Sequence, residues 1–226
     1  MYTMKAPASI KAISVFPNIN LETGKLMSYD TNYVYKIRDE NIIIYQMSSL
    51  FDTVIESQFR TLTRVHYFIY REGKDYGYDY DENRHPVAIR STLDSEFKYS
   101  WFVQNKFHPM LDHTLNDVTP RSSVLSRNRD TLKESFYIKG RKEPFMSLTI
   151  FLNYCRSLSN IDFTLSKELD SAAGKKLYEL RIVRDPMKIN DTLTWETYET
   201  YYKVERSEDY NKEKVRFYLN KFKSVE

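Results

Sequence analysis

The stretch Thr61–Tyr70, TLTRVHYFIY, decides the fold that this sequence predicts. It is rich in β-branched and aromatic residues, which suit the pleated, half-buried surface of a strand. We therefore predict a strand here. The segments on either side of it indicate whether that strand belongs to a run of strands or alternates with helices.

Further strands are predicted before this stretch. Ser9–Phe16 alternates polar and apolar residues, which is the period of a half-buried strand. Tyr33–Ile37 and Ile42–Tyr45 follow, after turn-like residues at Glu22–Lys25 and Asp39–Asn41. The first part of the chain therefore reads as consecutive strands joined by short turns.

Helices are predicted at three places. Ser49–Phe59 begins with a capping-box-like pattern and places apolar residues at offsets of three and four. Pro144–Leu158 begins with a proline that suits a first helical turn, and it carries an apolar stripe. Glu208–Phe222 is amphipathic and has lysines near its end. Between the last two, Ile161–Glu168 and Lys176–Arg184 read as a hairpin.

Strands in runs with few helices between them favour antiparallel sheets over alternating βαβ units. The predicted fold class is α+β, with mainly antiparallel sheet(s) and about three helices, including a C-terminal amphipathic helix. We expect a single domain over residues 1–226, which is a usual domain size. Residues 71–86 and 107–129 are predicted to be irregular segments of an interface-like kind.

The glycine content excludes one large group of functions. The five glycines are scattered singly, and they form neither a GxGxxG nor a GxxxxGK[ST] pattern. Loops that cradle phosphates need glycine, because only glycine lets the backbone approach the phosphate closely. The sequence therefore predicts no nucleotide bound through such a loop, and no cofactor is expected.

The N-terminal residues contain no apolar core of signal-peptide length, and the longest purely apolar run, Ile42–Tyr45, is too short to cross a bilayer. The one cysteine, Cys155, lies in an apolar run and cannot form an intrachain disulfide. We expect an intracellular protein, in a host cytoplasm or assembled in a virion, that is neither secreted through a signal peptide nor inserted in a membrane.

One alternative function is a small metal-dependent hydrolase or nuclease. Asp79 and Asp81 in the acidic loop 75–82 offer oxygen ligands for a hard cation, and His108 with His113 offers imidazoles. Each set is incomplete, because the loop lacks the EF-hand spacing and a His spacing of five turns the second ring away on a helix. An acidic surface loop is the simpler interpretation of these residues, and no metal site is expected.

A second alternative is a nucleic-acid-binding module. The segment 121–142 is strongly basic and has aromatic residues interleaved with its cations, an arrangement that can neutralise phosphates and stack bases. The net charge of the whole chain is only +3, which argues against a general nucleic-acid binder. The candidate residues are Arg121, Arg127, Arg129, Lys133, Lys139, Arg141 and Lys142.

The favoured hypothesis is a structural or assembly protein that is not an enzyme. The chain lacks a recognisable catalytic set, and residues with AT-rich codons dominate its composition, as in many phages and large viruses. We therefore expect one subunit of a homo- or hetero-oligomer, specifically a bacteriophage or viral head, head-tail connector or tail component, whose partners are other protein subunits. Tyrosine and arginine are common interface anchors, and the candidates are Tyr76, Tyr78, Tyr80, Arg127 and Arg129.

Overall fold

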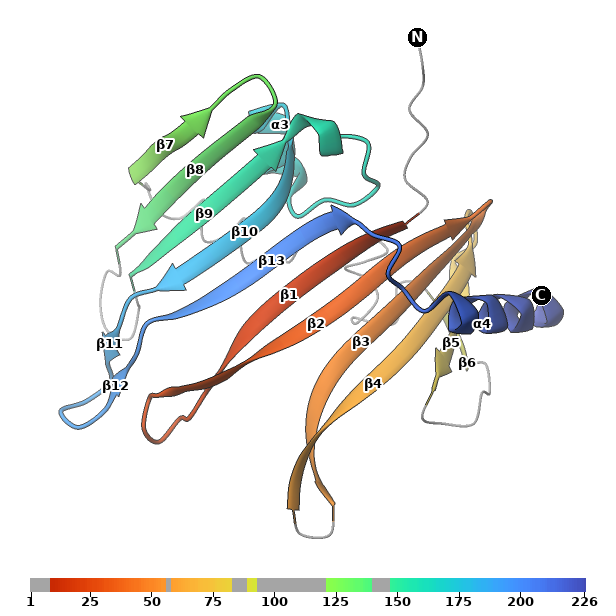
Figure 1. Cartoon of the computed structure of the whole chain (residues 1–226), viewed down its shortest axis with the longest axis horizontal. Coiled ribbons are helices and arrows are strands. Elements are labelled where there is room, and N and C mark those ends of the chain that lie inside the picture. Colours follow the sequence, from red (N-terminus) through yellow and green to blue (C-terminus); the bar gives the residue numbers. More distant parts are fainter. Residues whose placement is uncertain (1–8, 56–57, 83–88, 93–120, 140–146) are drawn as a thin grey trace. The chain divides into compact units, whose positions relative to one another are not determined.

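A computed structural model of the chain describes residues 9–55, 58–82, 89–92, 121–139 and 147–226 (Figure 1). Contacts between Cα atoms divide the chain into two compact units. Unit 1 comprises Met1–Ile13, Thr31–Gln104 and Glu205–Glu226. Unit 2 comprises Ser14–Asp30 and Asn105–Val204. The expectation of a single domain stays a prediction, and each unit is described by itself.

The described residues are mostly strand. The strands before residue 100 are β1 (Ser9–Ile19), β2 (Leu26–Asp39), β3 (Ile42–Ile55), β4 (Gln58–Arg71), β5 (Tyr76–Asp81) and β6 (Ile89–Thr92). The later ones are β7 (Arg121–Arg127), β8 (Thr131–Ile138), β9 (Leu148–Cys155), β10 (Lys176–Arg184), β11 (Met187–Lys188), β12 (Thr194–Trp195) and β13 (Tyr198–Arg206). The helical elements are η1 (Arg156–Leu158), α3 (Lys167–Ala173) and α4 (Lys212–Val225).

The predicted α+β class is wrong. Eleven strands form one sheet in the hydrogen-bonded order β6-β5-β4-β3-β2-β1-β13-β10-β9-β8-β7, and β11 pairs separately with β12. The described residues contain only two α-helices, α3 and α4. The protein is therefore predominantly β, because segments with helical spacing in the sequence pair into the sheet instead.

Unit 1 contains the strand from which the prediction started. Thr61–Tyr70 lies within β4, which confirms that prediction, and β4 pairs antiparallel with both β3 and β5. Residues alternate between the two faces of this sheet. One face carries Tyr67 and Ile69, which are 1% and 0% exposed, and the other carries the fully buried Phe68.

The predicted C-terminal amphipathic helix is confirmed as α4. The side chain of Asn211 caps it by accepting a hydrogen bond from the Lys214 backbone N–H. Its buried residues are Val215, Tyr218 and Phe222, which recur at three- and four-residue spacings and share a face. They form one cluster with sheet residues that include Tyr67, and Figure 1 shows α4 beside the strands of this unit.

The helix predicted at Ser49–Phe59 is wrong. The described residues of this range, 49–55 and 58–59, belong to β3 and β4, and the register runs from Ile42 opposite Arg71 to Ile55 opposite Gln58. Once the two segments pair, each strand provides hydrogen-bond partners for the other. This gain outweighs a helical spacing of apolar residues, since intrinsic propensity is a weak preference.

The helix predicted at Pro144–Leu158 is also wrong over its described part. Leu148–Cys155 forms β9, which pairs antiparallel with β8 on one side and β10 on the other. Ile150, Leu152 and Tyr154 are 1%, 0% and 1% exposed, so alternate residues of this strand form the core of unit 2. Both strand neighbours are distant in sequence, and a local pattern does not reveal them.

Helix α3 replaces one side of the predicted hairpin. The Ser166 hydroxyl accepts a hydrogen bond from the Leu169 backbone N–H, and Gly174 ends the helix in the left-handed region at φ 61°. Lys176–Arg184 is a strand as predicted, β10, but it pairs with β9 and β13. The predicted hairpin partner Ile161–Glu168 contains no strand.

The segments predicted to be irregular contain regular structure where they are described. Residues 71–86 include β5, which pairs with β4 and β6. Residues 107–129 include β7, which pairs with β8. Among the described residues, no helix has the length and apolar character that crossing a bilayer requires.

Candidate functional site

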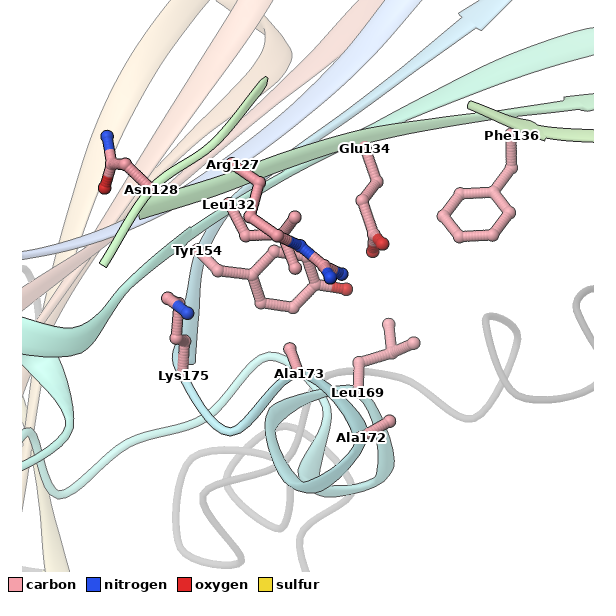
Figure 2. Close-up of a pocket in the computed structure, with 10 residues that line it drawn as sticks. All are labelled: Arg127, Asn128, Leu132, Glu134, Phe136, Tyr154, Leu169, Ala172, Ala173 and Lys175. Carbon is pink, nitrogen blue, oxygen red and sulfur yellow. The ribbon is translucent and has the colours of Figure 1, made fainter. Parts of the chain in front are cut away.

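Unit 2 contains a pocket between the sheet and helix α3, with a volume of about 440 Å³ (Figure 2). That volume lies in the range of small-molecule sites. Residues of β7, β8 and β9 line one side, and residues of α3 line the other. The lining residues are Arg127, Asn128, Leu132, Glu134, Phe136, Tyr154, Leu169, Ala172, Ala173 and Lys175.

The period of β8 explains why its side chains reach the pocket. Leu132, Glu134 and Phe136 are alternate residues of this strand, so they project from the same face of the sheet. On β9, Tyr154 lies opposite Leu132 in the register and therefore belongs to that face too. A β-bulge between Val124 and Ser126 on β7 shifts the pairing, and Arg127 lies opposite Leu132.

Glu134 and Tyr154 form the polar centre of the pocket. The Tyr154 ring is 1% exposed, and its hydroxyl hydrogen-bonds to the Glu134 carboxylate. Burial raises the pKa of this hydroxyl well above its ordinary value, and the negative charge of Glu134 raises it further. Tyr154 therefore stays protonated and donates to Glu134, which fixes one carboxylate position inside the pocket.

Two cationic side chains complete the lining. Arg127 lies at the end of β7, and Lys175 lies between α3 and β10. Figure 2 shows the Arg127 guanidinium directed into the space that Glu134 and Tyr154 also face. Among the residues that the structure describes, neither Arg127 nor Lys175 forms an ion pair. The lining thus carries two positive charges and one negative charge.

Asp170 holds α3 in place over the sheet. Its carboxylate accepts hydrogen bonds from the Thr164 hydroxyl at 2.5 Å and from the Leu177 backbone N–H at 2.6 Å. It also forms an ion pair with Lys176, whose Nζ lies 2.9 Å away. These contacts hold α3 against the start of β10, so part-buried polar interactions fix the α3 side of the pocket.

The pocket provides the elements of a binding site. Leu132 and Leu169 offer apolar surface, and Glu134 offers a hydrogen-bond acceptor in a partly enclosed space. Pockets that bind small molecules combine a mainly apolar lining with a few fixed polar groups. A search for groups of three or more potential metal ligands among the described residues finds none.

The structure places the cationic residues of the predicted basic segment, 121–142, in different surroundings. Arg127 lines the pocket, whereas Lys133 alternates to the other face of β8. Arg129 and Lys139 are exposed. Arg121 opens β7, and Arg141 and Lys142 lie outside the described residues. The structure therefore brings one of these candidates, Arg127, into the pocket.

The three candidate tyrosines of β5 belong to the packing of unit 1. Tyr80 is 1% exposed and lies in the α4 cluster, and burial raises the pKa of its hydroxyl to about 12. Tyr78 packs edge-on against Phe222 of α4, with ring centroids 5.9 Å apart. Tyr76 is half-buried, and Arg90 lies over its ring at 4.0 Å from the centroid.

The acidic loop 75–82 lies mainly in β5, and two of its carboxylates face side chains of β4. Asp81 forms an ion pair with Arg64 at 2.5 Å. An Asp79 carboxylate oxygen lies 3.7 Å from Nδ1 of His66, and both side chains are largely buried. His66 is thus a buried cross-strand residue, as the sequence predicted. His108 and His113 lie outside the described residues.

Sequence reasoning missed Tyr154, Leu169 and Lys175 as site residues. Tyr154 was missed because its segment was predicted to be a helix. Ile150, Leu152 and Tyr154 nevertheless show the two-residue period of a strand. Ser166 followed by Glu168 and Asp170 is a helix-start signal that predicts α3. No local signal places Lys175 in the lining of the same pocket as Arg127, because only the tertiary fold brings both residues there.

The fold and the site define a predominantly antiparallel β protein with a small-molecule-sized pocket beneath a short helix. No family model matches the chain, and no solved structure matches it. The comparison with curated proteins gives a probable polyketide synthase, "Probable polyketide synthase 23" from Dictyostelium discoideum, 27% identical over 141 residues. The match covers 57% of this chain and 5% of that protein's length, so it establishes no family.

Proposed function

We propose that this protein binds a small molecule in the pocket of unit 2. The observation that carries the proposal is the hydrogen-bonded pair of Glu134 and Tyr154, which places a carboxylate in a pocket of about 440 Å³ that polar and apolar side chains line together. Glu134 is half-buried, and its hydrogen bond from Tyr154 fixes the position of its carboxylate in the lining. The proposal concerns binding, and the expectation that the chain is not an enzyme stays a prediction.

Filling the pocket tests the proposal. Ala173→Trp adds a large ring to the α3 side of the pocket, and alanine-to-tryptophan changes are compatible with a helix. We expect this variant to bind a neutral fluorescent dye, N-phenyl-1-naphthylamine, about tenfold more weakly than the unchanged protein, a difference of ~1.4 kcal/mol. Ser171→Trp is the matched control, since it adds the same ring to α3 outside the pocket lining. Equal binding by all three proteins would refute the proposal.

A role as one subunit of a larger assembly is a second proposal. It is supported by β7, the terminal strand of the sheet, on which Val124 and Leu125 are 56% and 57% exposed. Terminal strands carry backbone groups that can pair with a further chain, and neighbouring apolar side chains add contact surface. A bacteriophage or viral particle remains the predicted setting for such an assembly.

A further inference from the structure

The charges that line the pocket of unit 2 point to the chemistry of its ligand. We propose that this pocket binds a small organic anion, which the positive charges of Arg127 and Lys175 attract, with an apolar body lying between β8 and α3. The inference rests on the proposed function, because it assigns a ligand class to the same pocket.

The first argument is the balance of charge. Arg127 and Lys175 form no ion pair within the part of the chain that the structure describes, and both line the pocket. Its one carboxylate, Glu134, already accepts a hydrogen bond from Tyr154. An anion entering the pocket therefore meets two cations that are not neutralised and one carboxylate that is already hydrogen-bonded. Arginine and lysine are the usual partners of carboxylates and phosphates.

The second argument is that the nearby acidic residues are already engaged. Asp170 forms an ion pair with Lys176 and accepts hydrogen bonds from Thr164 and Leu177. The Ser166 hydroxyl hydrogen-bonds to the Glu168 carboxylate at 3.3 Å. These acids stabilise α3 and its N-cap, so they do not neutralise the cations of the pocket.

The third argument concerns the remainder of the ligand. Leu132 and Phe136 line the β8 side of the pocket, and the half-buried Phe136 provides its apolar surface. Leu169 and Ala173 face them from α3 (Figure 2). An inorganic ion would leave this apolar surface uncovered, whereas an aromatic or aliphatic acid covers it while its charged end reaches the cations. A purely cationic ligand is disfavoured by both Arg127 and Lys175.

Two dyes with related ring systems separate charge from shape. The anionic dye 8-anilinonaphthalene-1-sulfonate and the neutral dye N-phenyl-1-naphthylamine share an anilinonaphthalene body, and only the first carries a sulfonate. We expect the unchanged protein to bind the anionic dye more tightly. In Arg127→Gln with Lys175→Gln, affinity for the anionic dye should fall about tenfold, as loss of charge-assisted contacts predicts. Affinity for the neutral dye should stay the same.

A matched variant controls for general positive charge. Lys133→Gln and Arg129→Gln together remove the same net charge from positions outside the lining. We expect this control to bind the anionic dye as the unchanged protein does. Thermal melting of both double variants checks that they remain folded. An equal loss of the anionic dye in both variants would overturn the inference, because it would indicate attraction to the whole surface.

The remaining outcomes separate the inference from the proposed function. If Ala173→Trp weakens both dyes but the unchanged protein does not prefer the anionic one, the pocket binds ligands and the anion inference is wrong. If Ala173→Trp affects neither dye, or neither dye binds at all, the proposed function fails and the inference fails with it. If Ala173→Trp weakens both dyes, and Arg127→Gln with Lys175→Gln loses the anionic dye while Lys133→Gln with Arg129→Gln keeps it, both stand.

Discussion

The ring of Tyr67 on β4 stacks against the ring of Tyr218 on α4, with centroids 4.5 Å apart and an interplanar angle of 29°. Burial and the negative charge of Glu82 raise the pKa of the Tyr67 hydroxyl well above its ordinary value, and this hydroxyl donates a hydrogen bond to Glu82. The aromatic pair therefore combines apolar burial with a satisfied polar atom, and it joins the C-terminal helix to the sheet of unit 1.

Removing the helix ring should destabilise unit 1. We expect Tyr218→Ala to lower the free energy of unfolding by about 3 kcal/mol, since a buried aromatic leaves a cavity when truncated. The neighbouring Phe217 is 49% exposed, so Phe217→Ala should cost less than about 1 kcal/mol. Urea denaturation of the two variants measures the difference. Similar losses would show that the burial of Tyr218 does not stabilise the unit.

Gly77 should not tolerate a side chain. A Cβ at this position would lie 2.6 Å from an atom of the Phe68 ring and 2.7 Å from the Ile69 carbonyl oxygen. We expect Gly77→Ala to cost about 1–3 kcal/mol, the range for overpacked cores. Asp75→Ala, in the exposed turn just before β5, should change stability by less than about 0.5 kcal/mol. Thermal and urea unfolding compare them, and an undiminished stability for Gly77→Ala would contradict the close packing.

The ion pair between Lys11 and Asp209 should make a small pH-dependent contribution to stability. The Asp209 carboxylate lies 2.8 Å from Lys11 Nζ, and hydrogen bonds from Lys11 and Ser207 lower its pKa to about 2. A lowered carboxyl pKa means that the unfolded chain binds the proton more readily. The stabilisation is therefore complete above the ordinary Asp pKa of 3.8 and is lost as the pH falls towards 2.

Asp209→Asn tests this pH dependence. Because Asp209 is 58% exposed, we expect the variant to lose less than about 1 kcal/mol at neutral pH. The difference from the unchanged protein should shrink as the pH is lowered from about 5 to about 2, because Asp209 becomes increasingly protonated and then resembles the neutral Asn. Urea denaturation across this range provides the measurement. A difference that stays constant with pH would mean that the charge of Asp209 contributes nothing.

The exposed residues of β7 should determine self-association if the protein is an assembly subunit. We expect Val124→Lys with Leu125→Lys to reduce the mass measured by light scattering at high concentration, since charge on a terminal strand opposes pairing. Leu21→Lys is the control, because Leu21 is 70% exposed in a different part of unit 2. A protein that is monomeric in every form would count against self-association through this strand.

The sequence predicted some elements of this fold better than others. The strand at Thr61–Tyr70 is confirmed, because its β-branched and aromatic residues suit a strand. The C-terminal helix is confirmed, because its apolar residues recur at helical spacing. The helices predicted at Ser49–Phe59 and Pro144–Leu158 are wrong, because their apolar residues also fit a strand and the pairing partners decide between the two. The sequence did not predict the pocket, and of its lining residues it singled out only Arg127, as an interface or nucleic-acid candidate.

The sequence by itself determined that β4 is a strand and that α4 is an amphipathic helix, since each depends on residues a few positions apart. Only the tertiary structure decided that β8 pairs with β9 and that α3 lies over the face of these strands that carries Leu132 and Tyr154. It also decided that Arg127 and Lys175 line one pocket. The physical reason is that pairing between strands adds hydrogen bonds and buries apolar side chains. Together these contributions outweigh the local preference of a segment for helix or strand. Tyr154 is an example. Its segment was predicted to be a helix, but pairing places Tyr154 opposite Leu132 in a strand, where its buried hydroxyl donates a hydrogen bond to Glu134.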